Sequence, residues 1–153
     1  MQLTKHTDYA LRVLMYVAQS GRRCTVAEIV ASYRISQSHV MKLVHELAKL
    51  GYLTTVRGKG GGITLAQDAS RIGVGRVVRD TEETLDVLDC LSDDYAGGCG
   101  IARGCALKSV LRKAQQAFYA ELDRYSLADI LPKARRSTVA WHDRKPAGAG
   151  AAR

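Results

Sequence analysis

Three of the four cysteines lie close together in the second half of the chain, where their thiol groups could bind a metal. Cys90, Cys99 and Cys105 are separated by eight and by five residues, and the segment around them is rich in glycine. Thiolates are ligands for soft metals, and a glycine-rich loop lets several of them converge on one centre. The pattern therefore favours a metal or iron–sulfur site in this segment.

Other interpretations of these cysteines stay open on the residues alone. A structural zinc site needs four ligands and usually takes closely spaced Cys-x₂-Cys pairs, which these cysteines do not form. The thiols could also form a redox switch or be inert buried groups, although a glycine-rich acidic loop is a poor place to bury them. Cys24 follows two arginines at a loop-to-helix junction, and we interpret it as a helix-boundary residue rather than a ligand.

No set of side chains has the spacing of a catalytic site, so we expect a protein that is not an enzyme. The histidines are scattered along the sequence, and none stands beside the cysteines. The glycine-rich run at residues 58–62 lacks the Lys-Ser/Thr pair that completes a phosphate-binding loop. Nucleotide binding is therefore not expected.

The charge is divided unevenly along the 153 residues, whose net charge is +8. Residues 1–80 carry twelve Lys/Arg against five Asp/Glu, whereas residues 81–131 carry five against nine. Residues 132–153 carry six against one. A basic first part indicates a polyanionic partner, and the pI near 9.5 is typical of nucleic-acid-binding domains.

The beginning of the sequence has no apolar core of the kind found in secretory signals, and no apolar run is long enough to cross a bilayer. We therefore expect a cytoplasmic protein without a membrane partner. Disulfides are disfavoured in that compartment.

Residues 1–65 predict a winged helix-turn-helix. Apolar residues at helical spacing predict a helix at 8–19, a capping-box pattern predicts a second at 25–33, and Ser36 is a suitable N-cap for a third that ends at Gly51. Two β-branched segments, 52–56 and 63–65, flank a basic glycine-rich turn and predict a hairpin.

In such a unit the third helix enters the major groove of DNA, and the hairpin forms a wing that contacts the backbone or the minor groove. Polar residues near the start of the third helix can reach base edges, and basic residues at the wing tip can bind phosphate. The predicted DNA-binding residues are Gln37, Ser38, His39, Lys42, Arg57 and Lys59.

The rest of the chain predicts a helix at 74–86, an irregular loop at 89–105 and a long helix from Ala106, whose apolar residues recur every three to four positions. The fold class is therefore mainly α with a small β-hairpin, a winged helix-turn-helix plus a long C-terminal dimerisation helix. The expected divisions are a DNA-binding domain at 1–80, the cysteine loop with the dimerisation helix at 81–131, and a disordered basic tail at 132–153.

The chain resembles the iron–sulfur winged-helix repressors. The resemblance rests on LTKHTDYALR at residues 3–12, the wing sequence VRGKGGG at 56–62, and three loop cysteines ahead of a long helix. It covers about residues 1–131. Asp8, the run CALK at 105–108 and the run LDRYSLAD at 122–129 are similar to the nitric-oxide-sensing branch.

The resemblance implies a homodimer that binds a partly palindromic DNA operator and releases it in response to nitric oxide. It implies a 4Fe–4S cluster, with 2Fe–2S as the alternative, held by Cys90, Cys99, Cys105 and Asp8 from the partner subunit. Arg12, one turn after Asp8, would hold that carboxylate.

Two features of the sequence bear on the signal. Lys108 stands where the iron–sulfur-biogenesis regulators have a ligand histidine, which argues against that branch. The wide spacing between the first two cysteines is more similar to the iron-responsive regulators. An iron- or cluster-status regulator, or a zinc- or thiol-based redox sensor, is therefore the alternative function.

Overall fold

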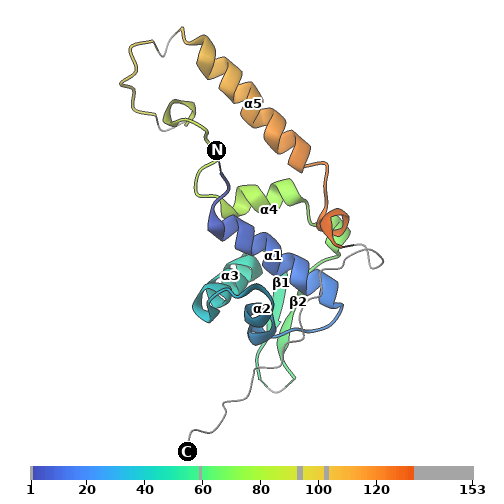
Figure 1. The fold of residues 1–153 in the computed structure, drawn as a ribbon. Helices are drawn as coiled ribbons and strands as arrows, with labels where there is room; N and C mark the ends of the chain where they lie inside the picture. Colours follow the sequence, from blue (N-terminus) through green and yellow to red (C-terminus); the bar gives the residue numbers. More distant parts are fainter. Residues whose placement is uncertain (1, 59, 93–94, 102–103, 133–153) are drawn as a thin grey trace, which may run out of the picture.

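The computed structural model describes residues 2–58, 60–92, 95–101 and 104–132 (Figure 1). These residues form α1 (Lys5–Ser20), α2 (Val26–Tyr33), α3 (Gln37–Lys49), β1 (Leu53–Val56), β2 (Gly62–Leu65), α4 (Val74–Thr81) and α5 (Ala106–Leu122), with short 3-10 turns at Ala69–Arg71, Asp89–Leu91 and Leu127–Ile130. None of the described helices is long and apolar enough to cross a bilayer. The predicted fold class, mainly helical with one hairpin, is confirmed.

The first three helices begin and end where short-range signals place them. Thr4 caps α1 by accepting a hydrogen bond from the Thr7 backbone, and Gly21 ends the helix in the left-handed conformation with φ 60°. Thr25 and Glu28 form the predicted capping box at the start of α2. α1 begins three residues earlier than predicted because the cap at Thr4, which lies outside the apolar repeat, sets its start.

A tight turn joins α2 to α3. Arg34 ends α2 with a positive φ of 55°, and its backbone N–H donates to the Val30 carbonyl. Ile35 is buried beneath the turn, and the predicted N-cap Ser36 accepts from the His39 backbone. The turn therefore fixes the angle at which α3 leaves the body.

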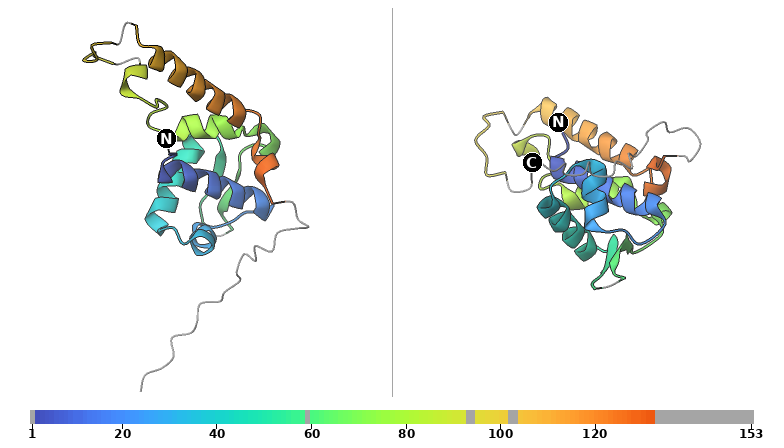
Figure 2. Two further views of the ribbon diagram at one scale, coloured as in Figure 1. Left: turned by 45° about the horizontal axis from the view of Figure 1, so that its top comes forward. Right: turned by 60° about the horizontal axis from the view of Figure 1, so that its bottom comes forward.

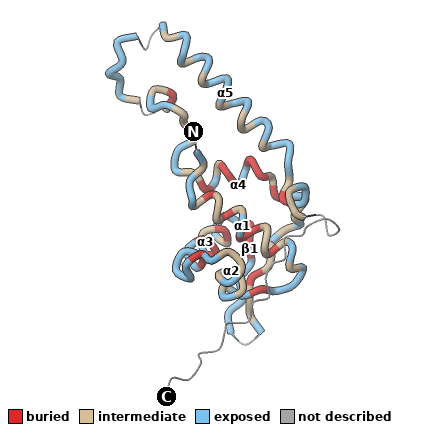
Figure 3. Tube along the Cα trace, in the orientation of Figure 1, coloured by how far each residue is buried: buried red, intermediate tan, exposed pale blue. Residues whose placement is uncertain are grey.

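The core lies where α1 crosses α3, α4 and β2. Its fully buried side chains are aliphatic apart from Thr7, Cys24 and Tyr52. The Tyr52 hydroxyl donates to Asp80 Oδ2 at 2.5 Å and so ties the start of the wing to α4. Burial raises the pKa of Tyr52. In Figure 3 the buried positions cluster in the α1–α4 body, whereas α5 has no buried residue.

The two strands form the predicted antiparallel hairpin, with Leu53 opposite Leu65 and Val56 opposite Gly62. Cys24 adds one bridge to the other side of β2, through backbone hydrogen bonds with Ile63 of 3.1 and 2.8 Å. Gly61 must be glycine because a Cβ there would lie 2.3 Å from the Val56 carbonyl oxygen. β2 is therefore hydrogen-bonded along both edges, to β1 on one side and to Cys24 on the other.

The predicted helix at 74–86 is wrong in its end point. α4 stops at Thr81, and Glu82 takes an extended conformation with ψ 135°. The reason is a long-range contact, because the Glu82 carboxylate accepts hydrogen bonds from Thr4. The residues from 82 to 88, which form neither helix nor strand, then lead toward the cysteines.

The long helix from Ala106 is present as α5, and it leaves the body as an arm (Figures 1 and 2). It is anchored at its C-terminal end, where Arg79 of α4 pairs with Asp123 and lies 5.1 Å from the centre of the Tyr119 ring. Leu127 then returns to the core. The predicted tail at 132–153 lies outside the described residues apart from Pro132.

Candidate nucleic-acid interface and cysteine loop

The predicted recognition helix α3 separates a buried face from an exposed one. Val40, Leu43, Val44 and Leu47 are buried, as their spacing predicts. The four candidate DNA-binding residues of this helix are all exposed: Gln37, Ser38, His39 and Lys42. Because they lie in the first two turns, their polar groups are available to base edges and phosphates from one end of the helix.

The wing presents a second basic surface. Arg57 is exposed at the end of β1, while Lys59 lies outside the described residues. Arg23, which sequence reasoning did not select, donates from its guanidinium to the Gly60 carbonyl at 3.1 Å. The tip of the wing is therefore tied to the α1–α2 connection. No local pattern signals this contact, because its partners are 37 residues apart.

Two contacts between α1 and α3 were also not predicted. The rings of Tyr9 and His39 meet edge to face, with their centres 6.2 Å apart. His6 Nε2 lies 2.9 Å from Glu46 Oε2. Helix periodicity placed Tyr9, His39 and Glu46 on their helices, whereas His6 lies before the predicted start of the first helix. The contacts depend on how the two helices cross.

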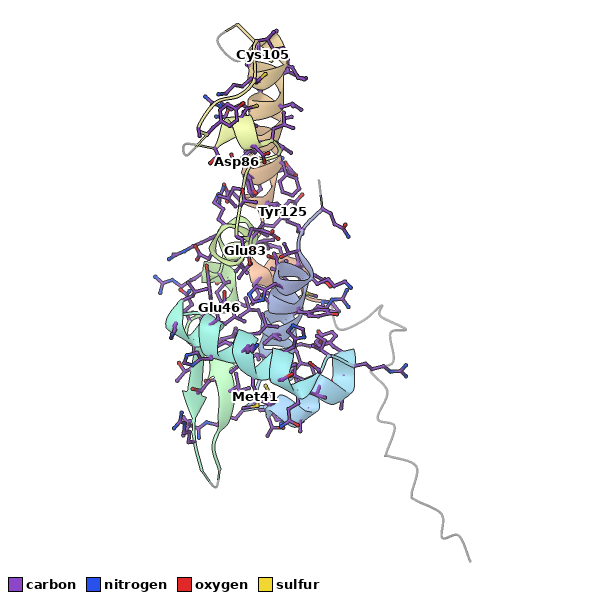
Figure 4. The ribbon with its side chains drawn as sticks, turned by 90° about the vertical axis from the view of Figure 1, so that its left-hand side faces the viewer. Met41, Glu46, Glu83, Asp86, Cys105 and Tyr125 are labelled. Carbon is purple, nitrogen blue, oxygen red and sulfur yellow. The ribbon has the colours of Figure 1, made fainter. Side chains whose placement is uncertain are left out.

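The three loop cysteines lie away from the DNA-binding helices. Cys90 is in the 3-10 turn next to buried Leu91, Cys99 is exposed, and Cys105 is the N-cap of α5. Figure 4 places Cys105 at the opposite end of the molecule from Met41 of α3. All three are free thiols. Among the described residues, no three His, Cys, Asp or Glu side chains are grouped closely enough to share a metal ion.

The residues nevertheless fit an iron–sulfur cluster in their chemistry. The three thiols are free and at least partly accessible, and the loop between them contains glycines with positive φ at Gly97 and Gly98. Such a backbone can rearrange at low cost to bring soft sulfur ligands together. The donor set therefore suits the cluster, although the single chain does not bring the sulfurs together.

The predicted pair between Asp8 and Arg12 is present on the surface of α1. Arg12 Nε donates to Asp8 Oδ1 at 2.8 Å, and this hydrogen bond raises the pKa of Arg12. Both side chains are about half exposed, at 45% and 48%. The carboxylate is thus oriented and accessible from outside the subunit.

Cys24 differs from the loop cysteines in its burial and in its contacts. It is fully buried, its thiol donates weakly to the Ile63 carbonyl at 3.6 Å, and burial raises the pKa of the thiol. A buried thiol of this kind is a poor nucleophile and a poor ligand. Cys24 lies directly before Thr25, the N-cap of α2, so it stands at the helix boundary where it was predicted.

α5 carries a partly uncovered apolar face. Leu107 and Val110 are each 59% exposed, and neighbouring Ala114 and Ala117 are exposed as well. The apolar repeat that predicted the helix is therefore not satisfied within the single chain.

Comparison with solved structures supports the fold. The chain is similar to a putative transcriptional regulator from Listeria innocua (TM-score 0.70, 20% identity, 92% of each chain). It is also similar to T. potens IscR (TM-score 0.66, 24% identity, 84% of this chain and 85% of that one). A third is CymR, the global cysteine regulator of B. subtilis (TM-score 0.66, 20% identity, 84% of this chain and 95% of that one). At these identities the likeness shows the fold alone.

Comparison of sequences shows the family. The chain is 42% identical over 133 residues to the HTH-type transcriptional regulator NsrR of Bacillus subtilis (strain 168), covering 86% of this chain and 90% of that protein. Residues 3–133 match the family described as Rrf2, iron-dependent transcriptional regulator. These relatives are regulators and not enzymes. The chain therefore belongs to the Rrf2 family of winged-helix, DNA-binding transcriptional regulators.

Proposed function

We propose that this regulator is a repressor whose affinity for its operator is controlled by an iron–sulfur cluster that senses nitric oxide. The observation that carries the proposal is the set of three free thiols, Cys90, Cys99 and Cys105, in a glycine-rich loop attached to a winged helix. The 42% identity to a protein named NsrR supports the same assignment.

DNA binding would use the exposed end of α3 and the wing. Gln37, Ser38 and His39 would face base edges, while Lys42, Arg57 and Lys59 would bind phosphates or guanine. Residues 1–80 carry a net charge of +7, from twelve basic and five acidic residues, which supports binding to a polyanion.

The cluster would be held by the three loop thiolates and by Asp8 of the partner subunit. When bound, it would supply iron that can take up nitric oxide, with 4Fe–4S as the proposed form and 2Fe–2S as the alternative. The chain's own contribution is a loop that can close around the sulfurs and a carboxylate oriented by Arg12. A carboxylate is a labile ligand in such a site, because iron–sulfur clusters are usually held by thiolates.

The exposed apolar face of α5 supports a homodimer. Isolated apolar side chains are common on protein surfaces, but Leu107 and Val110 continue a regular stripe along the helix. Pairing two such stripes would remove them from water. It would also set the two α3 helices one turn of DNA apart, about 34 Å, for a partly palindromic operator.

The experiment is an anaerobic absorption spectrum recorded during titration with nitric oxide, with DNA binding followed at fixed salt. The probe is a duplex selected from a random library by the wild-type protein. We expect a visible absorption band that bleaches in step with DNA release. Cys99→Ala should remove the band, whereas the matched variant Cys24→Ala should keep it, because that thiol is buried and separate.

Other outcomes would reassign the signal. A cluster that ignores nitric oxide but is lost on iron chelation, together with DNA release, would indicate a regulator of iron or cluster status. If protein prepared without oxygen shows no visible absorption, the cysteines would be assigned to zinc binding or to thiol chemistry instead. A normal spectrum in Cys99→Ala would overturn the ligand assignment.

A further inference from the structure

The first turn of α1 is hydrogen-bonded to the end of α4. Glu82 Oε1 accepts from the Thr4 backbone N–H at 2.8 Å and from the Thr4 hydroxyl at 3.1 Å. One turn further, the Thr81 hydroxyl donates to the Thr7 hydroxyl at 3.0 Å. We call these two contacts, Glu82–Thr4 and Thr81–Thr7, the α1–α4 latch.

The inner half of this latch is buried. Thr7 and Thr81 are the buried polar side chains of the described part of the chain, with exposures of 0% and 6%. The single hydroxyl proton of Thr81 is shared between Thr7 Oγ1 and the Val77 carbonyl of its own helix, which lies 2.8 Å away. Buried hydroxyls are costly when they lose their partners, so the two helix ends are fixed in register with each other.

The latch lies at the start of the segment that leads to the cysteines. Glu82 is the first residue after α4, and Cys90 follows eight residues later. Gln115 of α5 holds this segment further along, by donating to the Leu85 carbonyl at 2.5 Å. A displacement of the segment would therefore reach Glu82 before it reaches the core.

The same two turns of α1 contact the recognition helix. His6 is paired with Glu46 and Tyr9 packs on His39, so the segment from Thr4 to Tyr9 contacts α4 on one side and α3 on another. Through His39 the contact reaches one of the residues proposed to face DNA.

We infer that Glu82 is a positioning residue that links the stem of the cysteine loop to the recognition helix through the first turn of α1. The inference rests on the proposed function and adds a route to it. Asp8 would report the cluster held in the partner's loop, whereas Glu82 reports the loop of its own chain. Each α3 would thus respond to both halves of the dimer.

The test compares DNA affinity with and without the cluster in the full-length wild type and in Glu82→Ala. The ratio of the two affinities measures the coupling between loop and DNA. We expect Glu82→Ala to reduce this ratio by about fivefold, as loss of one hydrogen-bonded contact implies. Glu83→Ala is the matched control, because it removes the same charge from an exposed neighbour and should leave the ratio unchanged.

Glu82→Gln separates hydrogen bonding from charge. Its amide oxygen can still accept from Thr4, so it should keep most of the wild-type ratio. Amide hydrogen exchange gives a second readout, because the Thr7 N–H donates to Thr4 Oγ1 and the Asp8 N–H donates to the Thr4 carbonyl. Both amides should exchange faster in Glu82→Ala than in Glu83→Ala.

The outcomes distinguish a failure of this inference from a failure of the proposed function. If Glu82→Ala lowers DNA affinity equally in both forms, so that the ratio is unchanged, the residue is merely structural and the inference is overturned. A wild-type ratio of one would overturn the proposed function and this inference with it. A reduced ratio in Glu82→Ala with a normal ratio in Glu83→Ala supports the latch.

Discussion

Replacing Gly75 by alanine should loosen the joint that sets the direction of α5. Gly75 is buried in the first turn of α4, where the end of α5 crosses it. A Cβ at this position would lie 2.2 Å from Asp123 Oδ1 and 3.0 Å from the Asp123 backbone nitrogen. The side chain of Asp123 would have to move, and with it the ion pair that this side chain makes with Arg79.

The size of the effect follows from opposing contributions. Overpacking at a closed contact costs about 1–3 kcal/mol, and here the Asp123 backbone nitrogen at 3.0 Å cannot rotate away as a side chain can. Alanine recovers roughly 0.5–1 kcal/mol of helix propensity over glycine. The Arg79–Asp123 pair is largely exposed and adds little. The net loss should be about 1–2 kcal/mol of the free energy of unfolding, or roughly 2–8 °C in Tm.

Urea denaturation followed by circular dichroism would measure this loss. Gly73→Ala is the positional control, since a Cβ there would meet only the Arg76 Cβ at 3.9 Å, and it should cost less. In an Asp123→Ala background the nearest obstacle is gone, so Gly75→Ala should be less destabilising than in the wild type. An equal cost of Gly75→Ala in both backgrounds would refute the reasoning.

Three further predictions concern the joint, the wing and the dimer. The hydrogen bond from Arg79 lowers the pKa of Asp123. Its contribution to stability is therefore present above the ordinary carboxyl pKa and is lost as pH falls through the pKa of the folded state. The stability difference between wild type and Arg79→Gln should shrink below about pH 4 in acid unfolding curves. Arg57→Ala should reduce the slope of log affinity against log salt by about one in DNA titrations, and an unchanged slope would remove the wing from the interface. Val110→Glu should give monomers in analytical ultracentrifugation. The control variant Ser109→Glu, at an exposed neighbouring position, should remain a dimer. A dimeric Val110→Glu variant would argue against pairing through α5.

The parts of the fold that depend on neighbouring residues could be predicted from the sequence. The capping box at Thr25, the N-cap at Ser36 and the turn glycines of the wing act within a few positions, so the sequence pattern contains the whole interaction. The end of α4 could not be predicted in this way. Helix-compatible residues continue past Thr81, and a contact between Glu82 and Thr4, 78 positions apart, decides where the helix stops.

In the candidate site, too, local features could be predicted and long-range contacts could not. Sequence periodicity predicted that Gln37, Ser38, His39 and Lys42 would be exposed, because it identified the buried face of the same helix. It could not show that Tyr9 lies on His39, since that contact requires the crossing angle of α1 and α3. The cysteine positions were evident from the sequence. Their convergence was not, because a glycine-rich loop has no local signal that fixes its shape.

Under the proposed function, these contacts would let the cysteine loop act on DNA binding from the other end of the molecule. Among the described residues, α1 links the stem of the loop to the recognition helix, because its first two turns contact α4 through the latch and α3 through His6 and Tyr9. Because Thr7 and the following turns of α1 are buried, a displacement of its N-terminal end would be passed to the α3 contacts instead of being absorbed locally. In the proposed dimer the two α3 helices would bind two symmetry-related half-sites, so a shift too small to unfold either subunit would still change the spacing between them.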